Sequence, residues 1–211
     1  MEFDIVSMKQ RAKDLMRTTK PSVWLIGGIL GILAFAYVIV YMIIVNEFSE
    51  DMGKTLIILA IVEVVYLNIR SSCNFYCLKV AREEATNISD IFAAFKEYPV
   101  RTFFLGVIKD ICYLIGCLLL YVGYVFALYW FRFSVYVIKD EGCNPFKAMG
   151  KSMKLLKGHY RELIKLDISN IGWFVLMFCT CGVAAFYVKP YTTLVYAEFY
   201  DYLKAQSTLF E

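Results

Sequence analysis

The sequence predicts an all-α integral membrane protein: a polytopic transmembrane helical bundle of about six spans, with five possible, and amphipathic interfacial helices. Long apolar stretches and an uneven placement of lysine and arginine predict this class. Sixty per cent of the 211 residues are hydrophobic, against roughly 45–50% in globular proteins. Residues 23–45 contain no charged residue, and a helix of that length rises roughly 30–35 Å, enough to cross the hydrocarbon core.

The first apolar stretch is predicted to remain in the mature protein as a span. About twenty residues precede it, many of them charged, and it is longer than the roughly 7–15 residues of a signal-peptide core. Asn46 and Glu47 follow it, without a small-x-small cleavage site. Gly27 and Gly31 have a small-xxx-small spacing, which lets another helix approach closely. We expect this spacing to serve packing within one subunit.

Five further apolar stretches complete the predicted bundle. The stretch 103–138 is longer than one straight span requires, and a turn at Tyr121-Val122-Gly123 would divide it into two. A second turn, at Thr180-Cys181-Gly182, would separate the last two spans. Either hairpin could instead be re-entrant, which would leave five spans. The predicted spans after the first are residues 55–78, two within 103–138, 163–179 and 183–200.

Two polar segments are predicted to form short interfacial helices. Residues 1–20 form an amphipathic N-terminal segment, in which Ser7 and Gln10 have the spacing of a capping box. Its apolar residues recur at helical spacing, which is typical of a helix lying on a membrane surface. A second helix is predicted to start at Ser89 and to end at Pro99.

A third interfacial helix is predicted over residues 145–158 and is strongly basic. Asn144 followed by Pro145 is a favourable helix start, and Gly158 a favourable end. Its predicted apolar face is Phe146, Met149, Met153 and Leu156. A basic amphipathic helix suits an anionic membrane leaflet. The residues expected to contact lipid headgroups are Lys147, Lys151, Lys154, Lys157 and His159.

The distribution of positive charge predicts the orientation. With six spans and both termini inside, seventeen of the 22 lysine and arginine residues fall on the cytoplasmic side. Lys54 is then alone in the outside loops, and the remaining four lie within spans or at their edges. Cytoplasmic loops of membrane proteins carry such an excess of lysine and arginine. The single domain, residues 1–211, is therefore predicted to have its N- and C-termini in the cytoplasm.

The residue inventory gives no support for metal, cofactor or hydrolytic chemistry. The chain has one histidine and seven cysteines, and most cysteines lie in apolar stretches, where they behave as small hydrophobic residues. No zinc-site spacing, P-loop, His-Glu-x-x-His or Gly-x-Ser-x-Gly motif occurs. We therefore predict no catalytic residue, no metal, no cofactor and no nucleic-acid partner.

Polar residues at span depth are the most informative candidates for a site. Buried charges in a membrane are costly and tend to face the interior of the bundle. A ligand or ion cavity is one interpretation of Glu63, Arg70, Asp110 and Arg132. Interhelical pairs, or side chains that extend to the membrane surface, are the other interpretation. Asp167 is expected to pair with Lys165 or Arg161, or to cap its helix.

Several stretches together resemble the DUF975 family of bacterial integral membrane proteins. The resemblance covers nearly the whole chain and is most specific over residues 146–202. It implies a bacterial cytoplasmic membrane and supplies no catalytic residues. The stretches that carry it are Lys9-Gln10-Arg11-Ala12-Lys13, Ser89-Asp90-Ile91-Phe92, Phe95-Lys96, Ser152-Met153-Lys154-Leu155-Leu156-Lys157-Gly158-His159, Leu166-Asp167-Ile168-Ser169, Ile171-Gly172-Trp173, Pro190-Tyr191, Thr193 and Ala197-Glu198-Phe199-Tyr200.

Three functions are compatible with these patterns. The first is a non-enzymatic membrane protein that binds a lipid of the anionic inner leaflet or a protein partner, as an envelope accessory or protective factor. A protein partner would be another membrane protein or a second copy of the chain. The second is a small transporter or permease with a polar intramembrane cavity. The third, which the residues favour least, is a lipid-processing enzyme using carboxylates such as Glu63 or Asp110.

Overall fold

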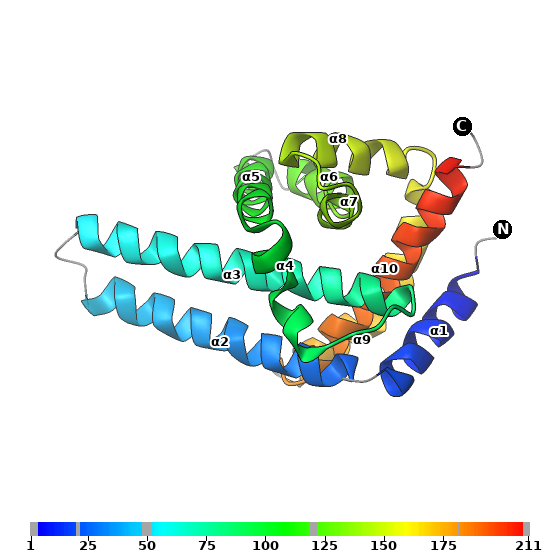
Figure 1. Ribbon diagram of the computed structural model, residues 1–211, viewed down its shortest axis with the longest axis horizontal. Coiled ribbons are helices and arrows are strands. Elements are labelled where there is room, and N and C mark those ends of the chain that lie inside the picture. Colours follow the sequence, from blue (N-terminus) through cyan, green and yellow to red (C-terminus); the bar gives the residue numbers. More distant parts are fainter. Residues whose placement is uncertain (1–3, 20–21, 48–51, 119–121, 181, 209–211) are drawn as a thin grey trace.

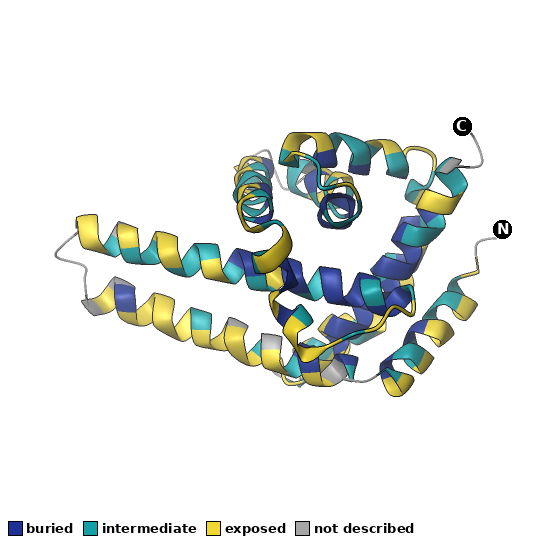
Figure 2. Cartoon of the chain, in the orientation of Figure 1, coloured by how far each residue is buried: buried dark blue, intermediate teal, exposed yellow. Residues whose placement is uncertain are grey.

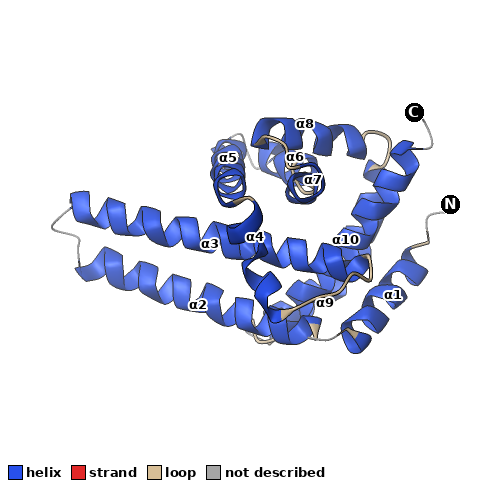
Figure 3. Cartoon of the chain, viewed as in Figure 1, coloured by secondary structure: helices blue, strands red, loops and turns tan. Residues whose placement is uncertain are grey.

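The computed structural model describes residues 4–19, 22–47, 52–118, 122–180 and 182–208. Within these ranges every regular element is a helix (Figure 3). The helices are α1 (Ile5–Thr18), α2 (Val23–Glu47), α3 (Met52–Ala81), the 3-10 helix η1 (Ile88–Phe92), α4 (Ala93–Glu97), α5 (Pro99–Leu118), α6 (Val122–Trp130), α7 (Ser134–Glu141), α8 (Pro145–Leu156), α9 (Tyr160–Cys179) and α10 (Ala185–Thr208). The all-α class is confirmed.

Two helices in the described part of the chain are long and apolar enough to cross a membrane. They are α2, over Leu25–Ile44, and α3, over Gly53–Ala81, and they lie side by side (Figure 1). Two helices that pass a test of length and composition are weak evidence for membrane spans. The other long helices, α5, α9 and α10, each carry three or more charged residues, and α6 has nine residues.

The two hairpins α2–α3 and α5–α6 cross each other. In Figure 1 α3 lies across the view, whereas α5 is seen nearly end-on. At the crossing, Thr102 donates a hydrogen bond to the buried Asn68 amide oxygen at 2.6 Å. Helices α5 and α6 pack closely because a Cβ at Gly116 would lie 2.4 Å from the backbone nitrogen of Tyr124. Two paired helices are thus present, as predicted, but Val122 and Gly123 of the predicted turn lie inside α6, and Tyr121 lies outside the described residues.

The core lies at one end of the molecule, where the second halves of α3 and α10 meet α7. Figure 2 shows buried residues concentrated there, whereas α2 is mostly exposed. Phe133 lies 5.8 Å from Phe199, and Tyr136 lies 5.3 Å from Tyr200, measured between ring centroids. Aromatic pairs at these distances add stability beyond their buried area.

The pair Gly27 and Gly31 serves packing within the chain, as predicted. A Cβ at Gly27 would lie 2.3 Å from Cγ of Pro190, and one at Gly31 would lie 2.6 Å from Cδ1 of Phe186. Both neighbours belong to α10, so these glycines let the start of α10 pack against the backbone of α2. Gly28, between them in sequence, has no such neighbour within 4 Å.

Helix α1 is amphipathic, as predicted, but its start differs from the prediction. Asp4 is the N-cap, because its side-chain oxygens accept hydrogen bonds from the backbone of Val6 and Ser7. The predicted Ser7–Gln10 capping box is therefore wrong. Ala12 and Met16 are fully buried against the protein core. The apolar face of α1 is thus used for packing on the rest of the chain.

The segment after α3 also begins and ends differently from the prediction. Asn87 is the N-cap of η1, where it forms a capping box with Asp90, so Ser89 lies inside the helix. Helix α4 ends at Glu97, and Pro99 is the first residue of α5. Proline suits this position because the first backbone N–H of a helix has no intrahelical partner.

Candidate functional site

An ion pair joins the α6–α7 turn to α9. Arg132 lies in that turn, and its Nη1 donates a hydrogen bond to Oδ1 of Asp167 at 2.8 Å. The two side chains are 21% and 19% exposed. The sequence predicted Lys165 or Arg161 as the partner of Asp167, and that prediction is wrong: the partner is Arg132. Arg161 and Lys165 are exposed on the surface of α9.

Two tyrosines flank the ion pair. The Arg132 guanidinium carbon lies 5.2 Å from the ring centroid of Tyr129 and 4.5 Å from that of Tyr196. The hydroxyl of Tyr196 donates to Oδ1 of Asp167 at 2.6 Å. Cation–π contact and the charge-assisted hydrogen bonds therefore hold the guanidinium and the carboxylate in fixed positions.

These four residues form the polar end of a groove of about 290 Å³. Its apolar wall comes from α9, where four side chains at helical spacing are exposed. From the polar end, this wall continues along α9 toward Phe174. We call this feature the Arg132 groove. Its lining residues are Tyr129, Arg132, Ile164, Asp167, Ile168, Ile171, Phe174 and Tyr196.

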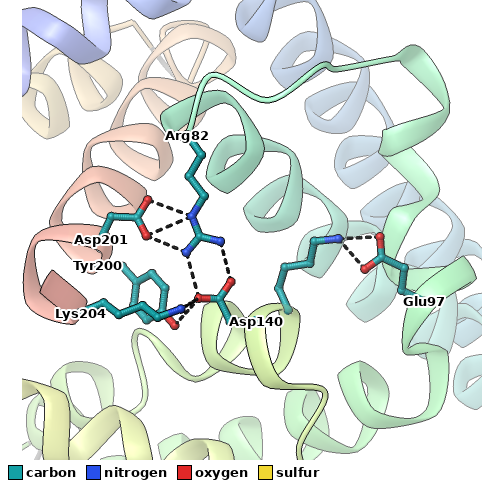
Figure 4. A network of polar contacts seen from close by, with 7 residues as sticks. Arg82, Glu97, Asp140, Tyr200, Asp201 and Lys204 are labelled. Carbon is teal, nitrogen blue, oxygen red and sulfur yellow. Dashed lines mark hydrogen bonds and ion pairs between the residues drawn. The ribbon is translucent and has the colours of Figure 1, made fainter. Parts of the chain in front are cut away.

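A network of ion pairs braces the helices that carry the groove (Figure 4). Arg82, just after α3, donates from Nη1 to Asp140 of α7 at 2.6 Å and from Nη2 to Asp201 of α10 at 2.7 Å. Asp140 also accepts hydrogen bonds from Lys204 at 2.6 Å and from the Tyr200 hydroxyl at 3.1 Å. The network fixes the end of α7, which follows Arg132, and the part of α10 that follows Tyr196.

The Asp140 carboxyl is stabilised in its ionised form. Burial raises its pKa, but the hydrogen bonds from Arg82 and Lys204 outweigh burial and hold the pKa below its usual range. Its side chain is 5% exposed, so an unpaired charge would be costly there. The network acts as a structural clamp around the groove.

The structure does not bring Glu63, Arg70, Asp110 and Arg132 into one direct cluster. Glu63 accepts a hydrogen bond from the hydroxyl of Tyr37 at 2.5 Å, between α3 and α2. Arg70 is exposed and Asp110 is half-buried. Asp110 lies within electrostatic range of Arg70 and Glu63. Arg132 alone lines the groove, so a cavity formed by all four stays a prediction.

The basic helix α8 begins as predicted, with Asn144 as N-cap and Pro145 in the first turn. Its buried residues are Ala148, Met149, Ser152 and Leu156. The predicted apolar face is therefore wrong at Phe146, which is 74% exposed. The helix ends at Leu156, and Gly158 adopts a φ of +98°, a conformation that glycine adopts readily.

The predicted headgroup residues differ in their surroundings. Lys147, Lys154 and Lys157 are exposed. Lys151 forms an ion pair with Glu141, and Nδ1 of His159 lies 2.7 Å from Oε2 of Glu162. Contact between these residues and lipid headgroups stays a prediction. Within the described residues no group of three histidine, cysteine or acidic side chains is placed to hold a metal ion.

Sequence reasoning missed both tyrosines of the groove and the partner of Asp167. The available signal was Asp167 itself, an acid placed just inside an apolar segment, which requires a cation at the same depth. Arg132 is a suitable cation because the apolar stretch around it isolates it from other charges in sequence. The tyrosines had no distinguishing spacing among the 16 in the chain.

All lining residues of the groove lie between residues 117 and 207, and this is the part of the chain that a family model matches. The matching family is described as "Protein of unknown function (DUF975)". The match covers residues 117–207. The DUF975 resemblance is confirmed for these residues, which also hold Asp140, Asp201 and Lys204 of the clamp. Searches of curated proteins and of solved structures found no match to the chain.

Proposed function

We propose that this chain is a non-enzymatic protein of the bacterial cytoplasmic membrane that binds a phospholipid of the inner leaflet in the Arg132 groove. It would act there as an accessory or protective factor of the envelope. The observation that carries the proposal is the groove itself: a fixed cation and carboxylate at one end, and an exposed apolar wall at the other.

The order of side chains along the groove supports a phospholipid as the occupant. Asp167, paired with Arg132, lies at the polar end of the groove, and Ile168, Ile171 and Phe174 follow it along α9. A phospholipid in a leaflet has the same order, from charged headgroup to acyl chain. Tyrosines are enriched at this depth of a membrane because one end of the ring is polar and the other apolar.

Exposed apolar side chains support a membrane environment beyond the two long helices. Large hydrophobic residues are exposed on α5, α6 and α9 as well as on α2, and soluble monomers rarely expose so large a connected apolar surface. Each of these helices would use this surface to face lipid. We propose α2 and α3 as membrane spans, because both are long and apolar enough. The other four predicted spans would require the α5–α6 hairpin to turn toward the direction of α3, because α5 is seen nearly end-on where α3 lies across the view (Figure 1) and transmembrane helices tilt by at most about 40°.

The cytoplasmic location of both termini is part of the proposal. Helix α1 and the end of α10 lie at the end of the molecule opposite the end of α2 (Figure 1). The basic helix α8 would lie along the inner leaflet, with Lys147, Lys154 and Lys157 near anionic headgroups. An epitope inserted after Glu50 should be accessible to antibody in intact spheroplasts, and a C-terminal epitope only after permeabilisation. The reverse pattern would contradict this orientation.

Native mass spectrometry of protein purified from membranes in mild detergent tests lipid binding. We expect the wild-type chain to retain one phospholipid, and Arg132→Gln to lose most of it. Lys96→Gln removes a cation from the exposed surface of α4 and should keep the lipid. Equal retention by both variants, or no retained lipid in the wild type, would contradict binding in the groove.

A small transporter is the second candidate function, and one observation favours it. Asp110 lies within electrostatic range of both Arg70 and Glu63, as in a polar pathway through the membrane. Because the substrate is not identified, proton leak is the direct assay. Liposomes that contain the purified chain and a pH-sensitive dye should then leak protons faster than empty liposomes, and Asp110→Asn should abolish the difference. Equal leak from both would remove this candidate.

A further inference from the structure

The Arg132 groove has a balanced pair of charges at its polar end. One guanidinium and one carboxylate lie 2.8 Å apart, and the two tyrosines beside them are neutral. This distinguishes the groove from α8 and its C-cap, where the exposed Lys147, Lys154 and Lys157 give a surplus of positive charge. The groove and the helix therefore favour different headgroups.

We propose that the lipid held in the Arg132 groove is a zwitterionic phospholipid with a primary ammonium headgroup. This inference rests on the proposed function and names the class of lipid. Arg132 would bind the phosphate, and Asp167 would bind the ammonium group.

The geometry of the pair leaves room for both contacts. Arg132 gives one hydrogen bond to Asp167, from Nη1, whereas a guanidinium has five N–H donors. Planar donor pairs of this kind match the oxygens of a phosphate. Asp167 accepts from Arg132 and Tyr196 through Oδ1, and a carboxylate has about four acceptor positions on its two oxygens. The Tyr129 side chain also hydrogen-bonds to the Asp167 carboxylate, so three of the about four acceptor positions are used and about one remains for an ammonium donor.

Charge complementarity decides between headgroup classes. An anionic headgroup would place its phosphate beside the Asp167 carboxylate and leave a net negative charge at a site that is largely shielded from water. A headgroup that carries its own ammonium group leaves no net charge. Like charges at close range repel strongly where solvent is excluded, so the balanced pair selects against an anionic lipid.

The apolar wall makes the groove a site for a lipid and not for a free headgroup. Ile168, Ile171 and Phe174 are exposed along α9, so an acyl chain attached to the headgroup can pack along them by van der Waals contact. A soluble compound with the same headgroup would gain only the polar contacts.

The test compares three lipids in nanodiscs that contain the full chain. Equimolar phosphatidylethanolamine, phosphatidylglycerol and phosphatidylcholine are offered, and the lipid retained after release into detergent is identified by native mass spectrometry. We expect phosphatidylethanolamine to be retained about tenfold over the other two. Phosphatidylcholine is informative because its quaternary ammonium cannot donate a hydrogen bond. Glycerophosphoethanolamine, which lacks acyl chains, should not displace the bound lipid.

A charge-changing variant gives the sharper result. Asp167→Asn leaves the groove with a net positive charge, so its preference should change to phosphatidylglycerol. Asp14→Asn removes an exposed carboxylate from α1 and should leave the preference unchanged.

The outcomes separate the two proposals. Retention of one lipid without preference, or preference for phosphatidylglycerol in the wild type, would overturn the headgroup assignment but not lipid binding. The second of these results would point to the exposed Arg161, one turn before Ile164, as the selecting residue. No retained lipid of any class would overturn both. The wild-type comparison decides the assignment even if Asp167→Asn does not fold.

Discussion

Helix α2 exposes apolar side chains, whereas the region around the Arg82–Asp140–Asp201 network, which we call the clamp end, buries polar ones. Along α2 most described side chains are apolar and exposed (Figure 2), although α3 and α10 pack against it. At the clamp end, α7 and the second half of α10 bury Asp140, Glu198 and the ring of Tyr200. In this chain, therefore, apolar side chains are often exposed and some polar side chains are buried. We attribute the difference to the surroundings: lipid for α2, and protein for the clamp.

This difference sets the expected cost of a substitution. At the clamp end, a change leaves a buried group without its partner, and such groups cost several kcal/mol. On the exposed face of α2, a substitution exchanges one apolar side chain in contact with lipid for another. The free energy of unfolding should therefore change little. Four measurements of stability in detergent or nanodiscs test the comparison.

The largest effect is expected for Arg82→Gln. The variant leaves the Asp140 carboxylate, 5% exposed, without its main partner, and should lower the free energy of unfolding by about 3–5 kcal/mol. Lys204 remains as a partial partner, so the lower end of that range is expected. The double variant Arg82→Gln with Asp140→Asn should recover part of the loss. A loss under about 1 kcal/mol would show that the network is not a structural clamp.

Substitution of the packing glycines should give the next largest effect. Gly27→Leu forces a side chain into the space of Pro190, whose Cγ would be 2.3 Å from the new Cβ, and should cost about 1–3 kcal/mol or more. Gly28→Leu is the matched control, because no atom lies within 4 Å of that position. Unfolding followed by tryptophan fluorescence compares the two. Equal stability of the two variants would contradict the packing of α10 on α2.

The pH dependence of stability should show the ionised Asp140. Because its pKa is lower in the folded state, its contribution is fully present above its unfolded pKa, about 3.9, and is lost as the pH falls through the folded value. The free energy of unfolding should fall more steeply between pH 6 and pH 3 for the wild type than for Asp140→Asn, because only the wild type loses the ionised carboxylate. Parallel curves would mean that Asp140 does not gain stability from its partners.

The smallest effect is expected on α2. Met42 is 68% exposed, and Met42→Ala should change the free energy of unfolding by less than about 0.5 kcal/mol. A loss of about 2 kcal/mol or more would be typical of a buried methionine. That result would mean that α2 is covered by protein, for example by a second copy of the chain, and the comparison between α2 and the clamp would fail.

The sequence predicted the positions of the helices better than the contacts between them. Apolar stretches located α2 and α3, and Gly27 and Gly31 indicated close packing, because these signals depend on neighbouring residues in the chain. The Arg132–Asp167 pair joins residues 35 apart in sequence, and nothing local in either stretch specifies the other. Phe146 shows the same limit: helical spacing predicted an apolar face, but tertiary contacts decide which part of that face is buried.

Arg82 shows why the clamp was not predicted. In sequence it was one of several cytoplasmic cations, and its partners Asp140 and Asp201 lie 58 and 119 residues away. Only the fold brings the ends of α3, α7 and α10 together. Short polar helices were also placed with an error of a few residues, because Asn87 and Ser89 are both acceptable caps and the choice depends on the contact with Asp90.

Photocrosslinking with a phospholipid that carries a diazirine in its acyl chain tests the central claim most directly. The labelled lipid is equilibrated with the protein in nanodiscs, unlabelled lipid is added in excess, and crosslinks are mapped by peptide mass spectrometry. We predict that crosslinks on α9 between Ile164 and Phe174 persist longer than those on α2, and that Arg132→Gln removes this difference. Equal persistence on α2 and α9, unaffected by Arg132→Gln, would contradict a specific lipid site in the Arg132 groove.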